Sequence, residues 1–130
     1  MNIIMSDATY SENSPSWYLI EKETNANIDN APKYKEALEV LNYNDSYSAA
    51  IIEPSQAGIN NPERRRDLIK LVEEINKKNI PLIICSVIKQ AELEGRTGLV
   101  EGQHYQKEFY VYKQDLEGKL SKILNMLNQD

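Results

Sequence analysis

Short apolar runs alternate along the chain with segments in which apolar residues have helical spacing. Four runs are rich in β-branched or aromatic residues and show no polar alternation: residues 2–5, 49–52, 81–87 and 109–112. Runs of this kind are typical of strands whose two faces are both covered. Apolar residues recur three and four positions apart in three other segments, 34–41, 68–75 and 116–127, as on one face of a helix. This alternation predicts βαβ units and a parallel sheet.

The segments that link these elements carry helix-start signals. The string Asn60-Asn61-Pro62-Glu63 predicts a helix start with an asparagine cap and a proline in the first turn. Asn60 and Glu63 also have the spacing of a capping box. Asp115 is the predicted cap of the last helix.

Two further segments give weaker patterns. Trp17, Leu19 and Ile20 predict a short first helix, and residues 26–29 predict a brief second strand. Residues 89–106 hold three glycines, so any helix there is predicted to be short.

Size and charge narrow the class of protein. The chain has 130 residues and a formal net charge of −5, so we expect one domain over residues 1–130. Its acidic balance argues against a nucleic-acid binder. A single cysteine excludes an internal disulfide framework and a Cys-rich zinc site. Because the chain has neither an apolar run of about 18 residues nor a secretory signal, we expect no membrane span and a cytoplasmic location.

Polar side chains follow the predicted strands at the points where they end. Asp7, Glu53, Ser86 and Lys113 stand after the first, third, fourth and fifth strands when residues 26–29 count as the second. Parallel strands collect functional groups beyond their carboxyl ends, so we expect these four side chains to lie together. Such a set suits a divalent cation and an anionic group.

In order and spacing, these residues resemble the receiver domain of response regulators, the CheY-like phosphoacceptor module. Receivers carry an acidic pair after the first strand, a phospho-accepting Asp after the third, Thr or Ser after the fourth, and Lys after the fifth. An aromatic residue precedes that Lys by three positions, as Tyr110 does here. The resemblance implies a flavodoxin-like three-layer α/β sandwich with a five-stranded parallel sheet in the order 2-1-3-4-5.

Three departures from the family pattern point to a pseudo-receiver that keeps the fold without being phosphorylated. Glu53 replaces the acceptor Asp, and its extra methylene displaces the carboxylate while imitating the reach and charge of phospho-Asp. Ser6 replaces one member of the acidic pair, which leaves Asp7 and Glu53 as the carboxylates for any metal. We therefore expect no cofactor, with Mg²⁺ binding weak or absent. Gln114 replaces the proline that usually follows the Lys.

Aromatic residues gather near the last strand and suggest a contact surface. Tyr110 and Tyr112 lie in this group, and aromatic residues are enriched at interfaces. In receivers, partners and dimer mates dock on the face that includes the last strand and the last helix. We therefore expect a signalling or adaptor domain that binds a protein partner, or a second copy of the chain, through this region.

Each singled-out residue also has a structural interpretation. Lys113 would then form an ion pair at the rim, Ser86 would bond to loop backbone, and Tyr110 would be half-buried with a hydrated hydroxyl. Cys85 is interpreted as an inert buried thiol, and His104 has no neighbouring metal ligand in the sequence. The basic run Arg64-Arg65-Arg66 is interpreted as a solvated, internally paired face, in preference to the alternative of a phosphate site.

The alternative to a binding domain is an enzyme on a similar fold. The string IIEPSQAG followed by a helix is loosely similar to small nucleoside 2-deoxyribosyltransferases, which use a carboxylate nucleophile. Under that hypothesis Glu53 or Glu63 would attack the sugar, and Asp7 would orient the substrate. The glycine-rich approach to the nucleophile in that family is missing here, so we favour the non-enzymatic hypothesis.

Overall fold

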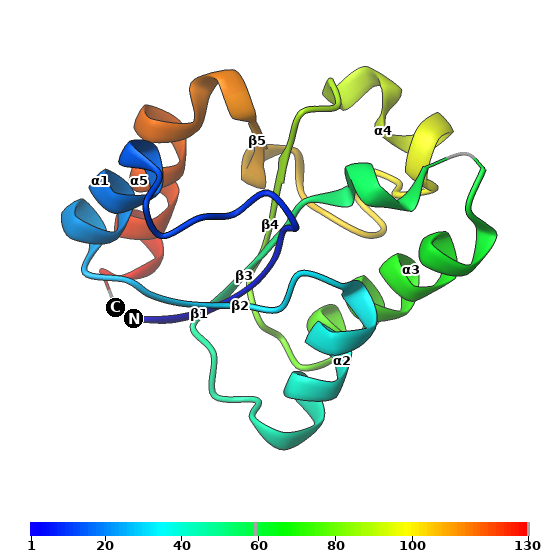
Figure 1. Cartoon of the computed structure of the whole chain (residues 1–130), viewed down its shortest axis with the longest axis horizontal. Helices are drawn as coiled ribbons and strands as arrows, with labels where there is room; N and C mark the ends of the chain where they lie inside the picture. Colours follow the sequence, from blue (N-terminus) through cyan, green and yellow to red (C-terminus); the bar gives the residue numbers. More distant parts are fainter. Residues whose placement is uncertain (59, 130) are drawn as a thin grey trace.

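The computed structural model describes residues 1–58 and 60–129, and within them the chain forms a five-stranded parallel sheet (Figure 1). The strands are β1 (Asn2–Ser6), β2 (Asn27–Asn30), β3 (Ala49–Ile52), β4 (Leu82–Ser86) and β5 (Tyr110–Tyr112). Their order across the sheet is β2-β1-β3-β4-β5, and each neighbouring pair is parallel. The predicted α/β class, the parallel sheet and the strand order are confirmed.

Helices cover both faces of this sheet. They are α1 (Pro15–Thr24), α2 (Tyr34–Tyr43), α3 (Pro62–Lys77), α4 (Gln90–Thr97) and α5 (Leu116–Leu127). Figure 1 shows α1 and α5 side by side on one face, and α2, α3 and α4 on the other. The short 3-10 helices η1 (Pro54–Ala57), η2 (Lys107–Phe109) and η3 (Lys113–Asp115) lie next to strand ends. None of the described helices has the length and apolar character needed to cross a membrane.

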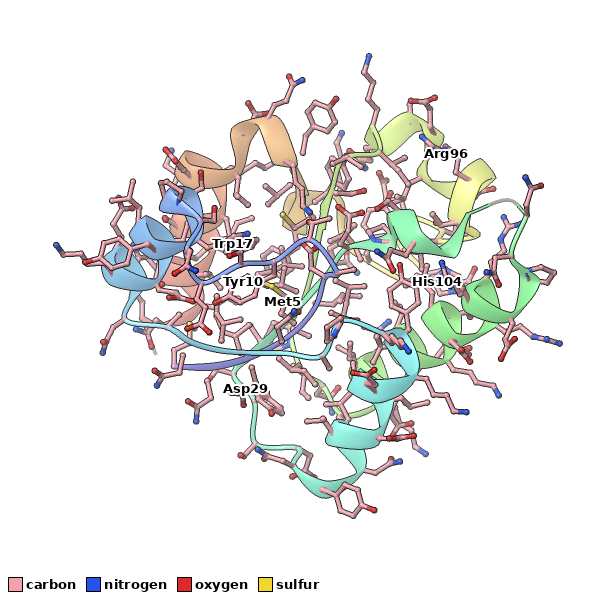
Figure 2. All side chains as sticks on the ribbon, viewed as in Figure 1. Met5, Tyr10, Trp17, Asp29, Arg96 and His104 are labelled. Atoms are coloured by element: carbon pink, nitrogen blue, oxygen red, sulfur yellow. The ribbon has the colours of Figure 1, made fainter. Side chains whose placement is uncertain are left out.

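Strands β1, β3 and β4 are largely apolar because successive side chains pack into two separate cores. On β1, Ile3 and Met5 pack toward α1 and α5, whereas Ile4 packs toward α2 and α3. The same division holds on β4, where Ile83 and Cys85 join the first core and Ile84 joins the second. Trp17 of α1 anchors the first core beside Tyr10, with ring centroids 5.5 Å apart (Figure 2).

The start of α3 corrects one detail of the capping prediction. The side chain of Asn61, rather than that of Asn60, accepts a hydrogen bond from the Arg64 amide at 3.1 Å, so Asn61 is the cap. The helix begins at Pro62, one residue after the cap, and the capping box expected from Asn60 and Glu63 is wrong. Pro62 imposes this register, because a ring with fixed φ and no N–H fits the first helical position.

The start of α5 corrects a second detail. Asp115 precedes the helix as predicted, but its side chain bonds to none of the described helix amides. The 3-10 helix η3 leads directly into α5, and the Leu116 amide donates to the Lys113 carbonyl instead. A backbone carbonyl therefore satisfies an amide at this helix start.

The two segments with weak patterns form regular elements. The short first helix is α1, and the predicted second strand is β2, which begins one residue later than expected. Helix α4 has 8 residues, as the glycine content of that segment predicted. It ends at Thr97, and the Gly98 that follows has a φ of +84°, a left-handed conformation that favours glycine.

Candidate functional site

The four strand-end side chains that were predicted to lie together do so. Lys113 contacts Asp7 and Glu53, and Glu53 also contacts Ser86. Asp7, Glu53, Ser86 and Lys113 follow β1, β3, β4 and β5, and we call them the carboxylate–lysine cluster. Asp7 and Glu53 are each 2% exposed, and Ser86 is fully buried. The register of the parallel strands produces this convergence, because their carboxyl ends share one edge of the sheet.

Lys113 links the two carboxylates. Its Nζ lies 2.8 Å from Asp7 Oδ2 and 3.2 Å from Glu53 Oε2, and it also donates to Thr9 Oγ1 at 3.1 Å. Burial acts to lower the pKa of Lys113, but the hydrogen bond to Asp7 and the charge of Glu53 outweigh it. The pKa of Lys113 is therefore raised above its ordinary value, and the ammonium stays charged at neutral pH.

Both oxygens of Glu53 are engaged by donors. Oε1 accepts from the Ser55 amide at 2.8 Å and from the Ser86 hydroxyl at 2.9 Å. Oε2 accepts from the Val87 amide at 3.1 Å, in addition to its ion pair with Lys113. Four donors from three elements thus compensate the desolvation of this buried carboxylate.

Asp7 is held by two residues that the sequence analysis did not single out. Its Oδ1 accepts from the amide and the hydroxyl of Thr9, at 2.8 and 2.7 Å. Asn30, at the end of β2, accepts from the Asp7 amide and donates to the Asp7 carbonyl. Both residues carried a usable signal, since Asp-x-Thr has the spacing of an Asx turn and Asn30 ends a strand.

The segment after β4 connects the cluster to Tyr110. Ser86 Oγ accepts from the Ile88 amide at 2.9 Å, and the Tyr110 hydroxyl donates to the Ile88 carbonyl. Tyr110 is a core residue, as its structural interpretation has it, but it is buried and its hydroxyl bonds to protein, so the half-buried position and the hydrated hydroxyl were wrong. Burial, and then the charge of Glu53, raises its pKa to about 12. Tyr112 is half-buried and packs against the α2–α3 core.

Ser6 does not join the cluster. Its side chain is fully buried, and its Oγ has no hydrogen-bond partner among the described residues. Within residues 1–58 and 60–129, no group of three or more His, Cys, Asp or Glu side chains is arranged to hold a metal ion.

Cys85 and His104 are both buried, and their surroundings indicate structural roles. His104 is buried, and its Nδ1 accepts from the Val100 amide at 2.8 Å, which closes a loop after α4. Cys85 is 1% exposed within the α1–α5 core, and burial raises the pKa of its thiol to about 12. Burial keeps reagents away from this thiol. Because the thiolate is the reactive form of cysteine, the raised pKa also lowers its reactivity.

We expect Cys85 to resist thiol reagents in the folded protein. Incubation with Ellman's reagent at pH 8 should give no measurable colour from native protein and one thiol per chain in strong denaturant. A native reaction at the rate of a free thiol would contradict the burial of Cys85.

Comparisons with known proteins give structural matches alone. No family model matches the chain, and no curated protein matches its sequence. A response regulator receiver domain protein from Clostridium thermocellum superposes with a TM-score of 0.65 at 16% identity, over 97% of this chain and 92% of that one. A fusion protein carrying a trimeric coiled-coil segment of yeast Spc42 matches with a TM-score of 0.66 at 12% identity, over 98% of this chain and 78% of that one.

These matches and the strand order agree on the architecture. At such low identities they establish the fold alone, and the alternative deoxyribosyltransferase hypothesis gains no support from the matched structures. The chain has the CheY-like receiver fold.

Proposed function

We propose that this chain is a receiver-like signalling domain that acts through protein–protein contact and is not phosphorylated. The observation that carries the proposal is the Glu53 carboxylate at the end of β3, with two oxygens bound by four donors. In the receiver fold this is the place of the phospho-accepting Asp. Here the Glu53 carboxylate pairs with the lysine and accepts from the hydroxyl beside it.

The bonds of Glu53 argue against phosphoryl transfer. A nucleophilic carboxylate must present a free oxygen in line with the phosphoryl group, and small misplacements cost large factors in rate. Both Glu53 oxygens already accept hydrogen bonds from ordered groups. Attack would require breaking at least one bond inside a buried site.

The position of Lys113 argues against a strong Mg²⁺ site at Asp7 and Glu53. Its ammonium contacts one oxygen of each carboxylate, so a divalent cation bound there would meet a positive charge at short range. Mg²⁺ also gives up its hydration water reluctantly and needs several oxygen ligands. The two carboxylates and the lysine therefore neutralise one another in large part without a metal.

Glu53 also holds the segment that follows β4. It bonds directly to Val87, and through Ser86 its influence reaches Ile88, whose carbonyl receives the Tyr110 hydroxyl. This series of contacts keeps Tyr110 inside the fold. We infer that the domain presents one fixed surface to partners instead of switching between two.

The surface we propose for partner contact lies on β5 and α5. Tyr112 is half-buried at the edge of the sheet, and Lys119 Nζ lies 6.0 Å from the centre of the Tyr110 ring. Met126, near the end of α5, is an exposed apolar side chain. A mixed aromatic, cationic and apolar surface suits a protein partner or a second copy of the chain.

Intact-mass spectrometry with a small-molecule phosphodonor and Mg²⁺ tests the absence of phosphorylation. We expect no adduct on the protein, while a phosphorylatable receiver domain treated in parallel gains one phosphoryl group. A stable adduct that maps to Glu53 would overturn the proposal.

Site-specific photo-crosslinking tests the contact surface. A photoreactive phenylalanine at position 112 is expected to capture a defined partner or a second copy of the chain. The matched control replaces Tyr43, which is 92% exposed at the end of α2, and should capture neither. Equal crosslinking from both positions would count against the β5–α5 surface.

A further inference from the structure

A pocket between α3 and the segment after α4 lies apart from the carboxylate–lysine cluster. Its volume is about 600 Å³, within the roughly 300–1,000 Å³ typical of small-molecule sites. None of the four cluster residues lines it. The α3 wall includes Arg65, Arg66, Ile69 and Lys70, and the opposite wall includes Gly98 and His104. Figure 2 shows His104 between α3 and α4.

The charge at this pocket is opposite to that of the whole chain. Three cationic side chains, Arg65, Arg66 and Lys70, line it together with one acid, Glu73, in a protein whose formal net charge is −5. The expected internal pairing of the arginine run is wrong. Among the described residues, no carboxylate oxygen lies within 4.0 Å of a side-chain nitrogen of residues 64–66 or of Lys70.

Arg65 is held in place without being neutralised. It is half-buried, and its Nη2 donates to the Gly95 carbonyl at 3.4 Å. The other nitrogens of its guanidinium remain able to donate, and a planar guanidinium is suited to binding a carboxylate with two parallel hydrogen bonds.

The floor of the pocket is apolar and depends on a bare glycine. A Cβ added at Gly98 would lie 3.4 Å from Arg65 Nε and 3.8 Å from Ile69 Cδ1. The missing side chain therefore leaves room beside the guanidinium and over Ile69. Nδ1 of His104 accepts from Val100, so the neutral ring carries its hydrogen on Nε2 and adds a donor to a mainly apolar wall.

We propose that this pocket binds a small organic carboxylate with an apolar body. The apolar part would pack over Ile69 and Gly98, and the carboxylate would pair with Arg65 and gain further attraction from Arg66 and Lys70. The three cations pair with no carboxylate of the described residues, so charge complementarity selects an anion. The apolar floor selects an anion with a hydrophobic part instead of inorganic phosphate. This inference does not depend on the function proposed for the carboxylate–lysine cluster.

An NMR titration of the full-length, isotope-labelled chain with 2-naphthoate tests the proposal. For a fragment of this size we expect a dissociation constant on the order of 1 mM, with amide shifts confined to α3 and residues 97–104. 2-Naphthylmethylamine, which carries the opposite charge on the same ring, should give no saturable shifts there. Raising the salt to about 1 M should weaken naphthoate binding by screening.

Two variants separate the proposed carboxylate contact from a general effect of charge. Arg65→Gln should raise the dissociation constant for naphthoate about tenfold, because a charge-assisted hydrogen-bonded pair is lost. The matched control Arg64→Gln removes the same charge from a neighbouring side chain that lines a different pocket, and should change the constant less than twofold.

Several outcomes would overturn the assignment. Equal binding of the amine and the carboxylate would do so, as would equal effects of the two arginine variants or shifts centred away from α3. If Arg65→Gln perturbs the spectrum of the whole protein, Arg66→Gln, at an exposed position on the same wall, gives the equivalent test.

Discussion

Replacing Lys113 with methionine is expected to lower the free energy of unfolding by about 3–5 kcal/mol. The substitution keeps the approximate length of the side chain but removes the ammonium that pairs with both Asp7 and Glu53. Two carboxylates, each 2% exposed, would then face one another without their shared cation. Urea unfolding followed by circular dichroism at pH 7 measures this loss.

Two comparisons make the result specific to the buried pairs. Lys122→Met removes a lysine at an exposed position of α5 and should change stability by less than about 0.5 kcal/mol. Adding Glu53→Gln to Lys113→Met removes one of the orphaned charges and should restore about 1–2 kcal/mol. Equal effects of the two lysine variants would show that the ion pairs contribute nothing.

The pH dependence of this stabilisation has a definite sign. Because the folded-state pKa of Lys113 is raised, its contribution is fully present below the ordinary value of 10.5. The contribution is lost as the pH rises through the folded-state pKa. The difference in stability between wild type and Lys113→Met should therefore stay constant at neutral pH and shrink above about pH 10.5.

Replacing Glu53 with alanine is expected to cost about 2–4 kcal/mol and to loosen the segment after β4. The Ser86 hydroxyl and the amides of Ser55 and Val87 would all lose their acceptor. Hydrogen exchange should show at least about a tenfold loss of protection at Val87 and Ile88. Urea unfolding gives the accompanying loss of stability.

Glu63→Ala is the matched control for this prediction. Glu63 is an exposed carboxylate in the first turn of α3, and its removal should change stability by less than about 0.5 kcal/mol and leave exchange at Val87 unaltered. Unchanged protection at Val87 in Glu53→Ala would contradict the proposal that Glu53 holds one fixed surface.

These two variants probe different parts of the same cluster. The Lys113 variant tests whether the ammonium balances the buried charges of Asp7 and Glu53. The Glu53 variant tests whether its carboxylate holds the backbone of the segment after β4. If both behave as expected, Glu53 at the acceptor position holds the lysine and the backbone around it without phosphorylation, which is the basis of the proposed function.

The sheet could be predicted from the sequence because a short apolar run marks a buried strand locally, and several strands carry such a run. Strands β1, β3 and β4 are buried on both faces, so apolar runs mark them to within a residue or two. The less regular α1 and β2 were also located, but with looser boundaries. Capping was predicted less well, because Asn60 and Asn61 are chemically equivalent and the backbone geometry at Pro62 selects between them.

The candidate site could be predicted in part. Strand-end positions identified Asp7, Glu53, Ser86 and Lys113, since parallel strands bring their carboxyl ends to one edge. Thr9 and Asn30 were not identified, because their roles depend on hydrogen bonds to Asp7. The arginine run was wrongly predicted to be internally paired, since charge spacing along a helix does not fix side-chain rotamers.

The sequence by itself determined the fold class, the order of elements and the residues that can meet at the strand ends. All three follow from the periodicity of burial, which is written residue by residue into the chain. The tertiary structure alone decided that Lys113 contacts both carboxylates, that Tyr110 is buried, and that three cations line one wall of an apolar pocket. Those features depend on distances between side chains far apart in the sequence, and such distances are set when the helices pack onto the sheet.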